Sequence, residues 1–159
     1  MSGRHLSAIG ILVLTVCLAV PAASAAMEKW LITPEEATRV RQSTGAVIER
    51  LSAVEGPGPL ILVKNPKMLE RVISPVNIFV SFKPGESGKN PDMKSLTVTL
   101  IGFFEIDITD RLREYIADDV LDIEDAELPN GSHNIRLAIK DTAGNPNERD
   151  MNINVIAQQ

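Results

Sequence analysis

The residues best suited to chemistry form the run Asp141-Thr142-Ala143-Gly144-Asn145. A carboxylate followed by glycine and asparagine is typical of a tight turn, in which the carboxylate accepts backbone N–H bonds and glycine adopts a positive φ. The same region could hold calcium through oxygens of Asp141, Asn145, Asn147 and Asp150. Calcium takes six to eight oxygen ligands, and this spacing matches no EF-hand. The sequence therefore predicts a hairpin turn and no bound metal, with a calcium loop as the alternative.

The stretch 105–127 is the most acidic part of the chain. Only Arg111 and Arg113 offset its carboxylates, which belong to Glu105, Asp107, Asp110, Glu114, Asp118, Asp119, Asp122, Glu124, Asp125 and Glu127. We interpret the stretch as a solvated face and loop that keeps the protein soluble. The alternatives are a divalent-cation site, which would make the protein a calcium-dependent binding module together with the Asp141 loop, and a surface for a basic partner.

The sequence assembles no catalytic set. His133 stands alone and is expected at the surface, and the chain has no G-x-S-x-G elbow, P-loop or dinucleotide-binding fingerprint. Paired carboxylates such as Glu105 and Asp107 could still serve a small polysaccharide-binding or polysaccharide-acting protein. Our prediction is a protein that is not an enzyme and has neither a catalytic residue nor a cofactor.

Three aromatic residues are candidates for contacting a partner protein. Trp30 is the only tryptophan, and it either docks the N-terminal segment onto the rest of the protein or anchors a partner. Phe103 and Phe104 are adjacent, so in a strand their side chains would point to opposite faces. We expect the partner to be another protein of the cell envelope. The net charge of −5 argues against a nucleic-acid ligand.

The N-terminus has the features of a cleavable secretory signal peptide over residues 1–25. Arg4 and His5 precede an apolar run over 8–20, and Ala23 and Ala25 give an A-x-A site with cleavage before Ala26. The apolar run is too short to span a bilayer. Cleavage removes Cys17, the single cysteine, and leaves no disulfide. The sequence predicts a periplasmic or secreted protein that is not inserted in a membrane.

The segment 26–58 is predicted to be a short helical arm ending in a linker. Thr33-Pro34-Glu35-Glu36 is a capping box with proline at the first helical position, so a helix is expected over 34–43 and a second one over 45–53. The run Gly56-Pro57-Gly58-Pro59 is a breaker and linker.

From residue 59 to 159 the hydrophobic period changes to two. Apolar residues fill the run 60–63. They alternate with other residues in the runs 76–82, 96–101, 106–108, 134–140 and 151–155, and turn residues separate these runs. Asn130-Gly131 is predicted to be a type I′ hairpin turn. The fold class is mainly β, an antiparallel β-sandwich of about seven strands. The segment 109–116 is left open, as a helical turn capped by Thr109 or a strand with Leu112 inward.

The last third of the chain resembles exported bacterial immunoglobulin-like and fibronectin-III-like domains. The resemblance rests on Leu128-Pro129-Asn130-Gly131-Ser132-His133, the alternating run 135–140 and Asp141-Thr142-Ala143-Gly144-Asn145. It implies an Ig-like fold over about 60–157 and a role in adhesion, scaffolding or spacing. The chain lacks the cysteine pair and core tryptophan of antibody domains. The expected function is a non-enzymatic interaction or structural module of the bacterial envelope.

Overall fold

The structure is a computed structural model that describes residues 30–41, 55–67, 70–102 and 104–157. The expected signal peptide, the second helix of the arm and Phe103 lie outside these residues. Across the described ranges, no helix has the length and apolar character needed to span a membrane.

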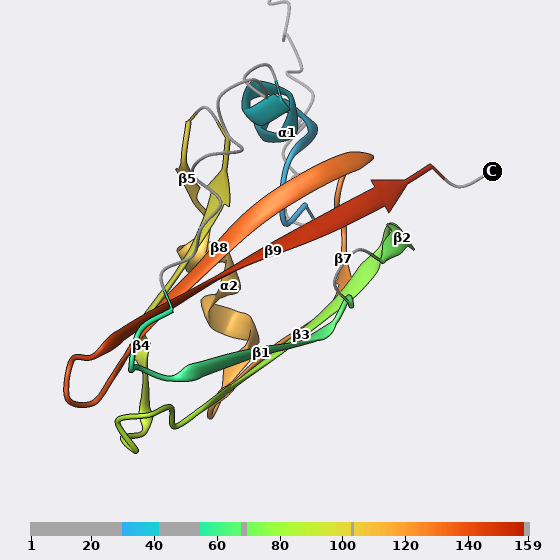
Figure 1. Ribbon diagram of the computed structural model, residues 1–159. Coiled ribbons are helices and arrows are strands. Elements are labelled where there is room, and N and C mark those ends of the chain that lie inside the picture. Colours follow the sequence, from blue (N-terminus) through green and yellow to red (C-terminus); the bar gives the residue numbers. More distant parts are fainter. Residues whose placement is uncertain (1–29, 42–54, 68–69, 103, 158–159) are drawn as a thin grey trace, which may run out of the picture.

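Two β-sheets face each other in the described part of the chain (Figure 1). One sheet has the order β1-β3-β7-β6, and the other has the order β2-β9-β8-β4-β5. The strands are β1 (Leu60–Asn65), β2 (Arg71–Ile73), β3 (Val76–Lys83), β4 (Pro91–Ile101), β5 (Ile106–Asp107), β6 (Ile116–Ala117), β7 (Val120–Ala126), β8 (Gly131–Asp141) and β9 (Pro146–Ile156). The predicted fold class, a mainly β sandwich, is confirmed.

The strand inventory differs from the prediction in two respects. The described residues form nine strands rather than about seven. The six expected runs form β1, β3, β4, β5, β8 and β9, whereas the short β2 and β6 and the acidic β7 were not predicted. Strand β2 runs parallel to β9, with Val72 opposite Val155, so the second sheet is mixed rather than wholly antiparallel. Strands of two or three residues contain too few side chains to show an alternating pattern.

The alternating side chains of the long strands build the core between the sheets. In β3, Val76, Ile78, Val80 and Phe82 are all buried, as their spacing of two predicted. In β8, the inward positions are His133, Ile135, Leu137, Ile139 and Asp141. Burial of each large aliphatic side chain contributes about 1.5–3 kcal/mol to folding.

His133 is buried, with 2% of its surface exposed, so the prediction of a surface residue was wrong. The residue lies two positions before Ile135 and therefore faces the same side of β8. Its Nε2–H donates to the Pro129 carbonyl at 2.6 Å. Burial lowers the pKa of His133, against the opposing effect of the hydrogen bond to the Pro129 carbonyl, and the nearby Arg41 charge lowers it further.

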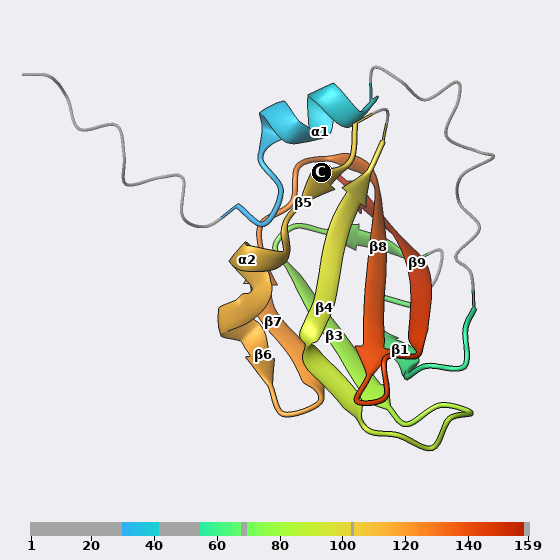
Figure 2. The ribbon, with the colours of Figure 1, turned by 90° about the vertical axis from the view of Figure 1, so that its left-hand side faces the viewer.

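Helix α1 (Pro34–Arg41) begins with the predicted capping box. The Thr33 N–H donates to Glu36 Oε2 at 2.9 Å, and the Glu36 N–H donates to Thr33 Oγ1 at 3.2 Å. Ala37 and Val40 point into the core, beside the buried Leu31 and Ile32 that precede the helix. Figure 2 shows α1 across one end of the sandwich.

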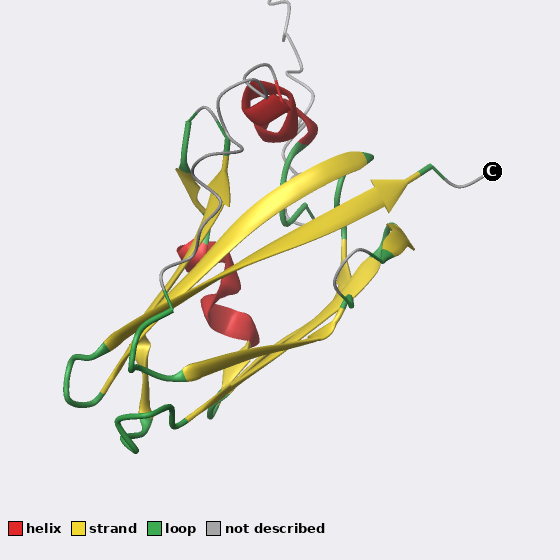
Figure 3. Cartoon of the chain, in the orientation of Figure 1, coloured by secondary structure: helices red, strands yellow, loops and turns green. Residues whose placement is uncertain are grey.

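The segment left open over 109–116 is mostly helical. Helix α2 (Thr109–Leu112) continues into the 3₁₀ turn η2 (Arg113–Tyr115), with Leu112 buried, and Figure 3 shows it between the two layers of strands. The proposed Thr109 cap was wrong. The Thr109 hydroxyl instead accepts the Val98 N–H at 2.8 Å, and Asp107 Oδ1 accepts the Thr109 N–H at 2.8 Å.

Two predicted connections have different roles in the structure. Asn130-Gly131 joins β7 and β8, which belong to different sheets, so it is not a hairpin turn. Gly131 has a φ of +128° and faces the Arg41 guanidinium, which donates to the Asn130 carbonyl. Gly58, which belongs to the predicted linker, packs against the β8–β9 turn. A Cβ at this position would clash with the backbone oxygen of Asn145.

Candidate functional site

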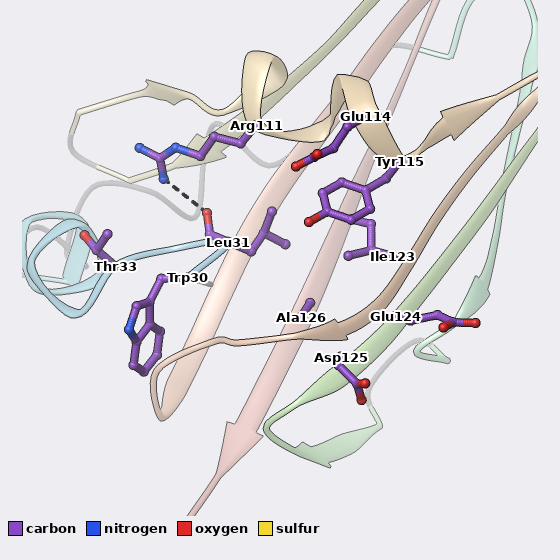
Figure 4. Close-up of a pocket in the computed structure, with 10 residues that line it drawn as sticks. All are labelled: Trp30, Leu31, Thr33, Arg111, Glu114, Tyr115, Ile123, Glu124, Asp125 and Ala126. Carbon is purple, nitrogen blue, oxygen red and sulfur yellow. Dashed lines mark hydrogen bonds between the residues drawn. The ribbon is translucent and has the colours of Figure 1, made fainter. Parts of the chain in front are cut away.

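A surface groove of about 510 Å³ lies between the N-terminal segment, the helical turn and β7 (Figure 4). We call it the β7 groove. Three parts of the chain line it: the segment before α1, the turn formed by α2 and η2, and the second half of β7. The lining residues are Trp30, Leu31, Thr33, Arg111, Glu114, Tyr115, Ile123, Glu124, Asp125 and Ala126.

Trp30 and Leu31 form the wall on the N-terminal side. Trp30 is half-buried and forms an isolated parallel bridge with Glu127, and the Leu31 N–H donates to the Glu127 carbonyl at 3.1 Å. Leu31 is buried in the core, and its carbonyl accepts Arg111 Nη1 at 3.1 Å, the bond drawn in Figure 4. These contacts fix the position of the tryptophan relative to β7.

The helical turn forms the opposite wall. Glu114 and Tyr115 lie across from Trp30 and Leu31, while Glu124 and Asp125 lie along β7 (Figure 4). Tyr115 is 36% exposed. Partial burial raises the pKa of the Tyr115 phenol, and the Glu114 carboxylate beside it raises it further, so the phenol is neutral at pH 7.

The charge of the groove is negative because its arginine is already paired. Arg111 binds both carboxylate oxygens of Glu36, outside the groove lining, at 2.6 and 2.9 Å. This pairing lowers the pKa of Glu36 to about 2, against the opposing effect of burial. The three lining carboxylates, Glu114, Glu124 and Asp125, are exposed. The residues that line the groove therefore combine two aromatic rings with a net negative charge.

One border of the groove is an incomplete sheet edge. Strand β6 pairs with β7 only at Val120 and Leu121. On that side of β7 no described strand pairs with residues 122–126, up to the Trp30 bridge at Glu127. Asp125 interrupts the regular strand with a φ of +55°, and its N–H donates to Asn77 Oδ1 on β3 at 3.0 Å.

The Asp141 loop has the geometry of a turn. The buried carboxylate accepts the N–H groups of Ala143 and Asn145 and the Asn145 side-chain amide, at 2.8–2.9 Å, together with the Ser87 hydroxyl. Gly144 has a φ of +88°. Burial acts to raise the pKa of Asp141, but these hydrogen bonds outweigh it and lower the pKa to about 2.

The other two calcium candidates point to different partners. Asn147 Oδ1 accepts the Gly56 and Glu148 N–H groups, each at 2.9 Å. Asp150 binds Arg136 through both oxygens, at 2.8 and 2.9 Å. Within the described ranges, no group of three or more His, Cys, Asp or Glu side chains is arranged to hold a metal ion.

The structure separates the aromatic partner candidates. Trp30 lines the β7 groove, whereas Phe104 lies between β4 and β5 and is 62% exposed. Phe104 therefore does not belong to a strand, and the expectation of opposite strand faces does not apply to it. Phe103 lies outside the described residues.

Most residues of the β7 groove were missed by sequence reasoning. The run Leu121-Asp122-Ile123-Glu124 alternates apolar and acidic side chains, which is the pattern of an edge strand with one face in the core. The high acidic content of the stretch 105–127 favours a solvated face and loop instead. The contribution of Tyr115 could not be inferred, since it depends on how η2 folds against β7.

Comparison with known proteins gives little to set beside this geometry. No protein-family model matches the chain, and no curated protein matches it. One solved structure, the crystal structure of an engineered protein, is similar at 14% identity with a TM-score of 0.41. That match covers 62% of this chain and 20% of the other, so the chain spans about a fifth of the length of the engineered protein.

Proposed function

We propose that this protein is a non-enzymatic module of the bacterial cell envelope, with an Ig-like sandwich that binds another envelope protein through the β7 groove. The observation that carries the proposal is the groove itself. Partly exposed Trp and Tyr rings are frequent anchors in protein interfaces, because they supply a large contact area at low entropic cost. Trp30 and Tyr115 face the same groove from opposite walls.

The Ig-like part of the proposal has its support in the sheet pairing. The sandwich contains a four-stranded and a five-stranded sheet, and the sequence run that resembles Ig-like domains forms β8 and the β8–β9 turn. Envelope location is supported by the signal-like N-terminus of the sequence. Sequencing the N-terminus of the protein purified from the native cell should give Ala26, and an intact Met1 would contradict export by cleavage.

The interaction is tested with a photoreactive phenylalanine analogue at one position at a time. We expect an analogue at Tyr115 to crosslink a defined envelope protein in living cells. The matched control carries the analogue at Thr97, an exposed position on β4 in the other sheet, and should give no such product. Excess unlabelled protein should compete the Tyr115 product away. Equal products from both positions, or none from Tyr115, would contradict the proposal.

A further inference from the structure

We infer that the β7 groove takes an extended, positively charged segment of the partner, which adds to the open edge of β7 as a further strand. The inference rests on the proposed function and specifies the chemistry of the partner. It follows from three observations: a strand edge that no described strand covers, a net negative charge, and two aromatic walls.

The first observation is the gap on the outer side of β7. The strand is flanked there by β6 at residues 120–121 and by the Trp30 bridge at Glu127. Between them, no described strand pairs with the outer side of residues 122–126, while Asp122, Ile123 and Ala126 pair with β3 on the inner side. Asp122 and Ile123 continue the regular strand, and Glu124 and Asp125 form a bulge before Ala126, with Asp125 at a φ of +55°. The edge therefore offers regular backbone to a short peptide at residues 122–123. Backbone pairing at such an edge is a general mode of peptide recognition.

The second observation is charge, which decides the kind of occupant. Asp122, Glu124 and Asp125 are exposed on the edge strand and Glu114 on the facing turn, while Arg111 is engaged by Glu36. If a second copy of this chain paired at this edge, the acidic β7 of one copy would lie against the acidic β7 of the other. Like charges placed opposite one another oppose such pairing. A segment carrying lysine or arginine is attracted instead.

The third observation is the pair of aromatic walls. Trp30 and Tyr115 line the groove near the two ends of the β7 edge. A lysine or arginine side chain placed between them could contact an aromatic face, an interaction of about 0.5–2 kcal/mol. Alternate side chains of an added strand point toward and away from the groove. The favoured segment therefore carries basic residues at every second position.

The experiment uses a short end-blocked peptide that alternates lysine and valine. Trp30 is the only tryptophan, so its fluorescence reports on the groove directly. We expect the peptide to change the emission saturably, with weaker binding at high salt, and to slow amide hydrogen exchange at residues 122–126. A peptide with glutamate in place of lysine should not bind. A peptide N-methylated at alternate residues should bind about tenfold more weakly, because it cannot donate to the edge.

Variants separate this site from general electrostatic attraction. Glu124→Lys should weaken the binding of the lysine peptide about tenfold. Glu86→Lys makes the same charge change at an exposed position between β3 and β4 and should leave binding nearly unchanged. Equal effects of the two variants, equal binding of the N-methylated peptide, or no exchange protection at 122–126 would overturn the inference.

Failure of this inference can be distinguished from failure of the proposed function. If an envelope protein crosslinks to Tyr115 but the lysine peptide neither binds nor competes, the partner is not a basic strand and only the inference is overturned. If nothing crosslinks at Tyr115, the interaction through the groove is overturned, and the inference with it.

Discussion

Arg111 binds Glu36 through two parallel hydrogen bonds, Nη2–Oε1 at 2.6 Å and Nη1–Oε2 at 2.9 Å. Glu36 belongs to α1 and Arg111 to α2, so the pair joins the N-terminal helix to the sandwich. The same Glu36 Oε2 accepts the Thr33 N–H that begins α1. The Glu36 carboxylate therefore caps its own helix and also attaches that helix to the turn formed by α2 and η2, which carries Tyr115.

Glu36→Gln is expected to lower the free energy of unfolding by about 1 kcal/mol. The amide keeps the shape of the side chain but loses the charge, and solvent screens the pair in part because Arg111 is 40% exposed. Urea denaturation measures the change. The control is Glu35→Gln in the same turn of α1, which is exposed and should change stability by less than about 0.5 kcal/mol. Similar losses in both variants would contradict the role of the ion pair.

The Glu36 contribution should disappear in acid. The folded-state pKa of about 2 lies below the ordinary glutamate value of 4.5, so the folded state binds this proton less readily than the unfolded chain. The stabilisation is complete above the unfolded pKa and is lost as the pH falls from about 4.5 toward 2. The difference in stability between the wild type and Glu36→Gln should shrink over this range. A difference that stays constant down to about pH 2 would argue against the lowered pKa.

The burial of the His133 ring predicts a second loss of stability, at mildly acidic pH. Burial lowers its folded pKa below the ordinary histidine value of 6.5, so the unfolded chain binds the proton more readily. The stability contributed by the neutral ring is therefore lost as the pH falls below about 6.5. Denaturation at pH 7.5 and 5.5 should show lower stability at pH 5.5 in the wild type and a smaller change in His133→Gln. An NMR titration that gives a pKa of 6.5 or above for this ring would contradict the prediction.

Calcium is expected to leave the thermal unfolding of the protein unchanged. A cation that binds the folded state raises the melting temperature by mass action. The Asp141 carboxylate, however, is surrounded by N–H and O–H donors, which orient their positive ends toward it. Differential scanning fluorimetry with millimolar calcium and with a chelator should give the same midpoint. A rise with calcium that is absent in Asp141→Asn would favour the calcium-binding alternative.

The Asp141 turn itself is expected to depend on the carboxylate charge. Asp141→Asn keeps the side-chain size but replaces one acceptor oxygen by a donor, which would oppose the N–H groups of Ala143 and Asn145. Amide hydrogen exchange at these two residues should become faster in the variant. Asp92→Asn, at a half-buried position on β4, serves as the control and should leave exchange in the turn unchanged.

Predictions from local sequence patterns are confirmed where a few neighbouring residues determine the local structure. The capping box of Thr33 and Glu36 needs only one turn of helix, and the Asp141 turn needs only five residues, so both appear in the structure as predicted. The alternation of β3 places Val76, Ile78 and Val80 in the core for the same reason. At His133 and Ile123 the period of two is present in the sequence, but the polar type of His133 and the acidic neighbours of Ile123 favour a surface position or a loop.

The sequence by itself determined that this is a mainly β protein, which residues of the long strands face the core, and where α1 begins, because backbone geometry and hydrophobic period act over a few residues. The tertiary structure alone decided that Asn130-Gly131 crosses between sheets, that Gly58 packs against a turn, and that β2 pairs in parallel with β9. It also brought Trp30, Tyr115 and Glu124 to one groove. These residues come from three separate segments, and their proximity depends on the packing of the whole sandwich rather than on any local propensity.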